Sequence, residues 1–257
     1  DSAIQILRWG NSGGRPVIVL APVNTADCYN LTCQAFNLAE TYRCPVFVAS
    51  NKEIGMTKES VSEEELAEIE VLSRAGSEES CSNLPYQPFA ASTDSMVPAF
   101  LPIGGTALVR QTSSSHGPDG FITTSPKALA EGVNRMRNKL GSHRDDLSFY
   151  RLDTDPAADT LVIVYGVTAR AAEVSIKRLR EQSHCISLLV LQTLYPVPEK
   201  LLIDEIAKVS RVIVVEMNLG QYVREVERFS GATAVEFFGK MDGELISPEE
   251  ITRVIVP

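Results

Sequence analysis

The stretch TLVIVYG, residues 160–166, decides the fold, because an unbroken apolar run of this kind is typical of a strand buried on both faces of a parallel sheet. The residues after it, 167–182, place apolar side chains at helical spacing. The alternation continues to residue 239, with strands expected at 186–192, 212–216 and 233–239 and helices at 198–210 and 219–229. Such alternation predicts an α/β fold, a doubly wound parallel sheet formed by residues 156–257.

A smaller unit of the same kind lies near the N-terminus. VIVL (17–20) and PVFVAS (45–50) read as strands, and the helical pattern between them has Asn24 or Thr25 as its N-cap. One βαβ unit is too small for a domain, so we expect its flanking strands upstream of residue 1. Residues 1–60 are then the distal part of a domain.

Residues 61–155 read as a mostly irregular connector that is rich in acidic residues, Ser, Pro and Gly. TALVRQ (106–111) could form a strand, and SSSHGPDG (113–120) is a turn cluster. A helix is expected over 125–143, with Ser125 as cap, Pro126 at its first position and Gly141 past its end.

Composition restricts the class of protein. The net charge of −9 argues against nucleic acid or an anionic membrane as the main partner, since both favour a basic face. No run approaches the ~18 apolar residues of a membrane span, and the N-terminal residues do not resemble a signal peptide, so we expect a cytoplasmic protein. The five cysteines form no CxxC pair, which indicates neither a disulfide framework nor a metal site.

Three groups of polar residues stand at candidate functional positions. Glu216 ends an expected strand and Asn218 is expected to cap the next helix; the carboxylate could orient the turn or serve a function at the sheet edge. Asn51, Lys52 and Glu53 follow another strand, where a solvated turn is the simpler interpretation. His116 lies in a Gly-rich turn and could meet a substrate carboxylate or shuttle a proton, or be an exposed polar residue.

Four segments in collinear order carry a family resemblance. They are LTCQAFNLAETYRCPVFVASNKEIG (31–55), DTLVIVYGVTARAA (159–172), EMNLGQYVREVER (216–228) and GKMDGELISPEEI (239–251). Together they resemble the alpha subunit of 2-oxoacid:ferredoxin oxidoreductases, most closely the 2-oxoglutarate type, and the resemblance covers essentially the whole chain.

The resemblance implies an oxidoreductase complex that decarboxylates 2-oxoglutarate on thiamine diphosphate and Mg, transfers the acyl group to coenzyme A and passes electrons to ferredoxin. It implies a [4Fe-4S] cluster in a beta subunit, a hetero-oligomer, and an upstream alpha or pyrimidine-domain segment. The chain would combine the distal part of a pyrimidine-binding domain with a transketolase C-terminal-like domain. The family's catalytic residues are expected upstream of this chain, so none is assigned here, and the chain alone would be inactive and bind none of these cofactors.

The resemblance also gives roles to the candidate residues. Asn51, Lys52 and Glu53 would stand at the edge of the pyrimidine domain that faces the cofactor. Ser115-His116-Gly117 aligns with a Thr-His-Asp turn near the active-site mouth, although Gly117 replaces the aspartate. Glu216, Asn218 and Gln221 would lie at an inter-domain or inter-subunit contact.

Two alternatives remain open at the level of the sequence. The substrate could be pyruvate or a branched-chain 2-oxoacid, and the physiological electron acceptor is not fixed. The chain could also be a non-catalytic assembly or regulatory module derived from the subunit.

Overall fold

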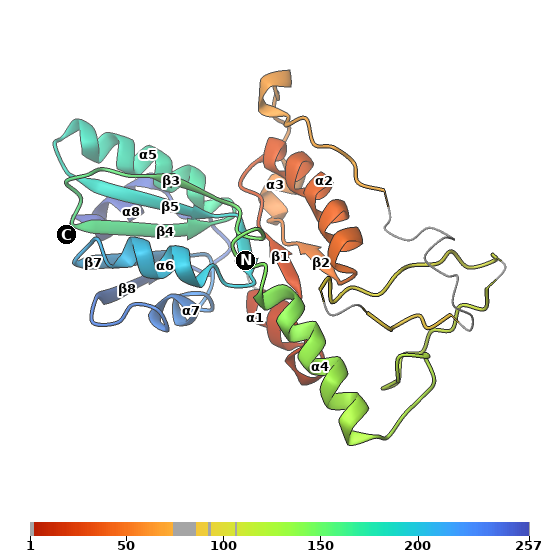
Figure 1. Ribbon diagram of the computed structural model, residues 1–257. Helices are drawn as coiled ribbons and strands as arrows, with labels where there is room; N and C mark the ends of the chain where they lie inside the picture. Colours follow the sequence, from red (N-terminus) through yellow and green to blue (C-terminus); the bar gives the residue numbers. More distant parts are fainter. Residues whose placement is uncertain (1–2, 74–85, 92–93, 106, 257) are drawn as a thin grey trace.

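The computed structural model describes residues 3–73, 86–91, 94–105 and 107–256, which form two α/β units joined by a connector (Figure 1). The C-terminal unit is a five-stranded sheet in the order β3-β5-β4-β7-β8, in which β3 is antiparallel to β5 and the other neighbours are parallel. Its strands are β3 (Tyr150–Asp153), β4 (Thr160–Tyr165), β5 (Ile186–Leu191), β7 (Arg211–Glu216) and β8 (Ala234–Gly239).

Helices cover both faces of this sheet. On one face, α5 (Thr168–Glu181) and α8 (Pro248–Ile255) bury a core that includes Val162, Ile213 and Ile251. On the other, α6 (Glu199–Ile206) and α7 (Val223–Glu227) pack on Leu161 and Val212. The predicted doubly wound sheet is therefore confirmed, with one antiparallel edge strand that the sequence pattern did not indicate.

The first unit contains the predicted βαβ arrangement. Strands β1 (Ile18–Leu20) and β2 (Val46–Val48) are parallel, with α2 (Thr25–Tyr42) between them in the chain. Asn24 is the N-cap of α2, because its side chain accepts a 2.8 Å hydrogen bond from the Asp27 backbone N–H. The shorter helices of this region are α1 (Ile4–Trp9), α3 (Lys52–Met56) and the 3-10 turns η1 (Ser12–Gly14) and η2 (Glu63–Glu65).

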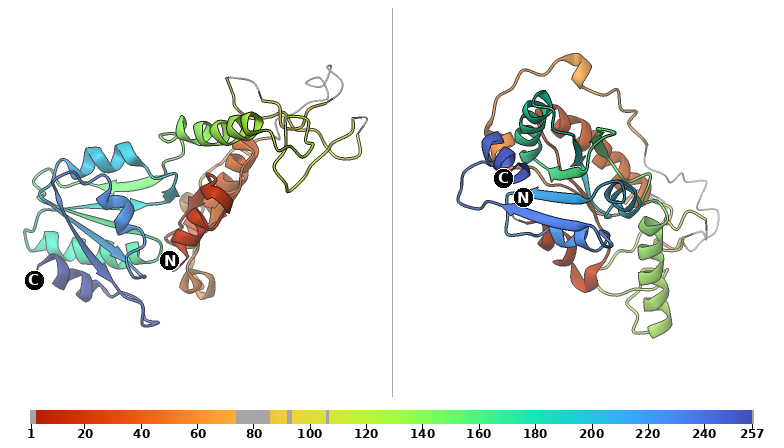
Figure 2. Two further views of the ribbon diagram at one scale, coloured as in Figure 1. Left: turned by 90° about the horizontal axis from the view of Figure 1, so that it is seen from below. Right: turned by 90° about the vertical axis from the view of Figure 1, so that its left-hand side faces the viewer.

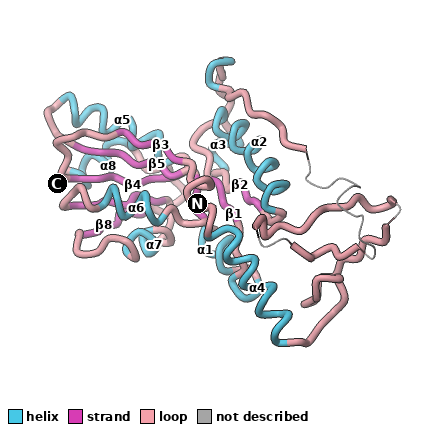
Figure 3. Tube along the Cα trace, in the orientation of Figure 1, coloured by secondary structure: helices cyan, strands magenta, loops and turns pink. Residues whose placement is uncertain are grey.

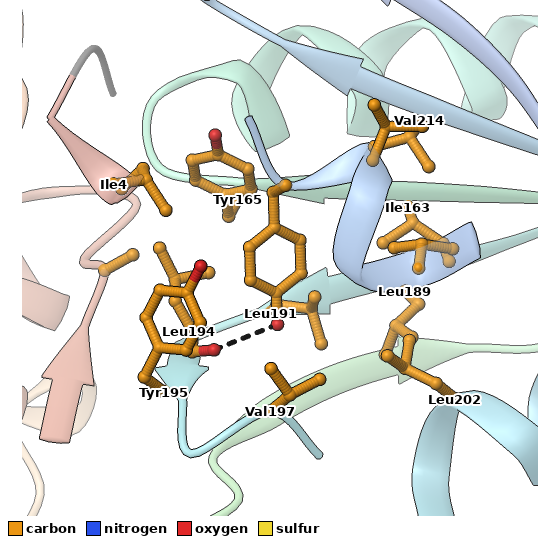
Figure 4. Packing of buried hydrophobic residues seen from close by; sticks show 14 of the residues in the cluster. Ile4, Ile163, Tyr165, Leu189, Leu191, Leu194, Tyr195, Val197, Leu202 and Val214 are labelled. Atoms are coloured by element: carbon orange, nitrogen blue, oxygen red, sulfur yellow. Dashed lines mark hydrogen bonds between the residues drawn. The ribbon is translucent and has the colours of Figure 1, made fainter. Parts of the chain in front are cut away.

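A short strand from the C-terminal half joins the two units. Strand β6 (Thr193–Tyr195) pairs antiparallel with β1, bringing Tyr195 opposite Val19 and Thr193 opposite Leu20. One apolar core then runs across the boundary, from Ile4 of α1 to residues of the C-terminal sheet (Figure 4). Burial of this continuous apolar surface stabilises the arrangement of the units.

The described loops between residues 86 and 125 lie on the side of the first unit away from the C-terminal sheet (Figures 2 and 3). The strand that residues 106–111 could form is not present over 107–111, and residue 106 lies outside the described part of the chain, as do residues 74–85. An isolated β-prone run gains little without a neighbouring strand to pair with.

One helix of the connector matches its prediction closely. Helix α4 (Pro126–Gly141) has Ser125 as its N-cap, and the Ser125 hydroxyl accepts from the Ala128 backbone N–H at 3.4 Å. Gly141 is its last residue rather than the residue beyond it, and Ser142 is the C-cap. Strand β3 lies within the range read as connector, so the C-terminal sheet begins earlier than residue 156. Among the described helices, none is both long enough and apolar enough to cross a bilayer.

Candidate functional site

Asn51 lies where the carboxyl ends of the two sheets meet. It follows β2, is 6% exposed, and its side-chain oxygen accepts a 3.1 Å hydrogen bond from the backbone N–H of Val167, just after β4. Functional groups of α/β proteins collect at such edges. The structure thus gives Asn51 a definite role in joining the two units, which the solvated-turn interpretation does not include.

Lys52 and Glu53 differ in their surroundings. The Lys52 side chain is 74% exposed, and its Nζ lies 3.7 Å from Oε1 of Glu53. Glu53 lines a cavity of about 510 Å³ together with Thr168 and Arg170 at the start of α5. The hydroxyl of Thr168 is buried and has no hydrogen-bond partner among the described residues. This junction cavity therefore combines a carboxylate, a guanidinium and an unpaired hydroxyl near a helix N-terminus.

Glu59 was not singled out from the sequence, yet it connects three parts of the junction. Its Oε2 accepts from the Thr25 hydroxyl at 2.9 Å, and its Oε1 lies 2.5 Å from Nη1 of Arg170. These contacts, chiefly the hydrogen bond from Thr25, lower the pKa of Glu59 below its usual value. In the sequence, Glu59 is one member of an acidic stretch, and the sequence gives no sign that it pairs with α5.

Glu216, at the end of β7, is 1% exposed and forms several hydrogen bonds within the chain. Its Oε2 accepts from the Tyr165 hydroxyl at 2.7 Å and from the Tyr222 backbone N–H at 2.9 Å, and its Oε1 accepts from the Val223 backbone N–H at 2.8 Å. Burial, followed by the nearby Glu216 carboxylate, raises the pKa of Tyr165 well above its usual value. Glu216 therefore orients the turn into α7, which is one of the two roles left open by its position.

Asn218 supports the same turn but is not the helix cap expected from the sequence. Its side-chain oxygen accepts from the backbone N–H groups of Gly220 and Gln221, both at 2.8 Å, whereas the N-cap of α7 is Tyr222. Gly220 has φ +83°, a conformation that favours glycine, and this turn separates Asn218 from the helix.

The three residues expected at an interface are thus not equivalent. Glu216 and Asn218 are enclosed by the chain itself, with 1% and 0% exposure. Gln221 does reach the first unit: its side-chain oxygen accepts from the Gln5 backbone N–H at 3.0 Å, and its carbonyl accepts from the Gln5 side chain at 2.6 Å. Contact with another subunit remains a prediction.

His116 lies in a different place from Asn51 and Glu53. Its ring stacks on Phe89 with centroids 3.7 Å apart, and its Nδ1 is 3.1 Å from the carbonyl oxygen of Gly117. It lines a second cavity, of about 600 Å³, between the connector, the end of α2 and helix α4. The structure therefore does not bring the four candidate cofactor-proximal residues together.

A thiamine diphosphate site would require ligands for a diphosphate and its magnesium ion. Within the described ranges, no group of three or more His, Cys, Asp or Glu side chains could hold a metal ion. Mg²⁺ in such sites is usually held by one or two carboxylates together with water and the phosphates of its ligand.

Comparison with known proteins defines the class. Residues 3–135 match the family described as "Pyruvate flavodoxin/ferredoxin oxidoreductase, thiamine diP-bdg", and residues 158–251 match "Pyruvate:ferredoxin oxidoreductase core domain II". The chain belongs to this family of 2-oxoacid:ferredoxin oxidoreductases.

Within the family, the chain is similar to alpha subunits of the 2-oxoglutarate type. It is 34% identical to 2-oxoglutarate synthase subunit KorA of Methanocaldococcus jannaschii, over 97% of this chain and 66% of that protein. It is 32% identical to the subunit of the same name from Methanothermobacter thermautotrophicus, over 100% of this chain and 67% of that protein. The chain thus spans about two thirds of the length of these relatives.

A solved structure shares the fold. It is described as "2-oxoglutarate:ferredoxin oxidoreductase from Magnetococcus marinus with 2-oxoglutarate, coenzyme A and succinyl-CoA bound". Its TM-score is 0.85 with 22% sequence identity, and the match covers 99% of this chain and 44% of that one. The arrangement of the two units is therefore one that is found in a solved member of this enzyme class.

Proposed function

We propose that the chain is part of the alpha subunit of a thiamine diphosphate-dependent oxidoreductase that converts 2-oxoglutarate to succinyl-CoA and passes the electrons to ferredoxin. The observation that carries the proposal is the match to 2-oxoglutarate synthase subunits at 34% and 32% identity over nearly the whole chain. The shared fold with a 2-oxoglutarate:ferredoxin oxidoreductase supports it.

In this proposal the chain forms one side of the cofactor site, and partner chains supply the rest. Thiamine diphosphate would supply the chemistry that makes the 2-oxoacid lose its carboxylate. Asn51 holds the end of β2 against Val167, and Glu59 holds Arg170 of α5 against Thr25 of α2, so the carboxyl edges of both units keep a fixed relation. Such pre-organised edges are needed where a site is assembled from several domains.

The relatives are named as subunits of larger enzymes, which supports the assignment of the remaining components to partner chains. We assign the magnesium ion, the diphosphate contacts and the [4Fe-4S] cluster to a beta subunit, and we expect a cytoplasmic hetero-oligomer. Lys52, Glu53 and His116 remain proposed cofactor- or substrate-proximal residues, and Gln221 remains a proposed interface residue.

Native mass spectrometry of the complex purified with this chain tests the proposal. The expected result is a hetero-oligomer that contains an iron–sulfur beta subunit and thiamine diphosphate. A chain that purifies without such a subunit would support the alternative of a non-catalytic assembly module.

A further inference from the structure

The cavity beside α4 has a strongly one-sided charge. Its wall includes Arg15, Arg43, Arg135, Lys139 and His116, and no Asp or Glu is found among its described lining residues. The chain as a whole carries a net charge of −9, so a wall of this sign is not a consequence of general composition. A cavity of about 600 Å³ lies in the size range of small-molecule sites.

Lys139 is the most unusual member of this wall, because its ammonium group is buried. The residue is 4% exposed, and its Nζ donates to the carbonyl of Tyr42 and lies 3.5 Å from that of Arg43. Carbonyls partly satisfy the donors of the ammonium group but do not neutralise its charge. Burial lowers the pKa of Lys139, and the nearby Arg135 and Arg43 lower it further.

Arg135 adds a second cation one turn away on the same helix. One of its terminal nitrogens donates to the carbonyl of Met96 at 2.9 Å, and this is the one hydrogen bond of its five guanidinium donors to another described residue. Among the described residues, Arg15, Arg135 and Lys139 form no ion pair with a carboxylate. Bringing uncompensated cations together at a partly buried wall is costly, and a bound anion would offset that cost.

The wall of the cavity also contains two aromatic rings, those of Phe89 and His116. Phe89 and His116 stack at a 26° interplanar angle. Arg43 fixes the loops beside them, since its guanidinium donates to the carbonyls of Pro88 at 2.7 Å and Ala99 at 3.3 Å. A cavity whose lining includes both cations and aromatic rings suits a ligand with phosphates and a planar base.

We propose that this cavity binds a phosphorylated nucleoside, with the phosphates on Arg135, Lys139 and Arg15 and the base near Phe89 and His116. Two sources share this chemistry: a free nucleoside diphosphate and the ADP portion of coenzyme A. A free nucleotide ligand would go beyond the proposed function, whereas a coenzyme A ligand rests on it. Because binding is measured without turnover, the site and the proposed function can each fail without the other.

Isothermal titration of the full chain with ADP, coenzyme A and inorganic pyrophosphate tests the site. The variants are Arg135→Gln, which keeps a donor but removes the charge, and Lys139→Met, which keeps the length of the side chain. Lys127→Gln is the matched control, because Lys127 is exposed on α4 and lies outside the cavity wall. Lys139→Met could misfold, because the carbonyls at the end of α2 lose the ammonium group that donates to them. Arg135→Gln does not remove that contact, so it tests the site independently.

Saturable ADP binding that weakens at least about tenfold in Arg135→Gln and is unchanged in Lys127→Gln supports the site, as expected for one charge-assisted contact. Coenzyme A binding with the same dependence identifies the cofactor as the source; ADP binding without coenzyme A binding identifies a free nucleotide. Absence of saturable binding of all three ligands, or an equal loss in Lys127→Gln, overturns the proposal.

Discussion

The hydroxyl of Tyr165 donates a 2.7 Å hydrogen bond to Oε2 of Glu216, and both side chains are 1% exposed. The two residues end neighbouring strands, β4 and β7, at the carboxyl edge of the C-terminal sheet. Because the same carboxylate accepts from the backbone at the start of α7, the pair couples the sheet edge to the helix that follows it. Glu216 is therefore a structural residue of the fold, placed where functional residues are often found.

Replacement of this carboxylate tests that conclusion. We expect Glu216→Gln to lower the free energy of unfolding by about 2–4 kcal/mol, because an amide cannot accept all the donors that surround the buried carboxylate. Chemical denaturation followed by circular dichroism measures the loss. Glu227→Gln, an exposed position on α7, is the control and should change stability by less than about 0.5 kcal/mol. Equal stability of the two variants would remove the structural role of Glu216.

The hydrogen bond between Asn51 and Val167 predicts a local effect at the junction. We expect Asn51→Ala to leave the Val167 backbone N–H unpaired and to cost about 1–3 kcal/mol locally. Hydrogen exchange at Val167 should become faster, while exchange in the centre of β5 should not change. Asn51→Asp retains an acceptor oxygen and should protect Val167 far better than alanine; identical exchange in both variants would contradict the account.

Helix α8 should respond to acid through Glu250. The Ser247 backbone N–H, the Ser247 hydroxyl and then Lys240 lower the pKa of Glu250 from its ordinary 4.5 to about 2. A lowered pKa stabilises the folded state above pH 4.5, and this contribution is lost as the pH falls from 4.5 towards 2. Amide protection factors in α8, which are corrected for the intrinsic pH dependence of exchange, should therefore fall over that range in the natural sequence, and this acid dependence should diminish in Glu250→Gln. An unchanged pH profile in the variant would show that other groups control the helix.

The sequence predicted the regular parts of the fold well, because long apolar runs such as 160–166 and capped helices such as α4 carry strong local signals. It did not predict β6, whose three residues pair with β1 far away in the chain. It also suggested a strand at the β-prone residues 107–111, where the structure has none. Whether each segment forms a strand depends on a partner strand to pair with, and local periodicity does not reveal pairing between strands that are distant in the chain.

The candidate site was predictable only in part. Asn51 and Glu216 were found because Asn51 follows a strand and Glu216 ends one, but their hydrogen-bond partners come from other elements. The cationic wall of Arg15, Arg135 and Lys139 was missed because its members come from two distant segments, and only folding places them around one cavity. Helical spacing explains Arg135 and Lys139 on one face of α4, which was the one local signal available.

The most direct test of the account is coenzyme A-dependent reduction of ferredoxin by the natively purified complex that contains this chain. The rate should be compared for 2-oxoglutarate, pyruvate and a branched-chain 2-oxoacid. The account predicts a kcat/KM for 2-oxoglutarate at least roughly tenfold above the other two, as expected where substrate groups are read by specific contacts. Reduction that is faster with pyruvate or the branched-chain acid, or absent with all three, would contradict it.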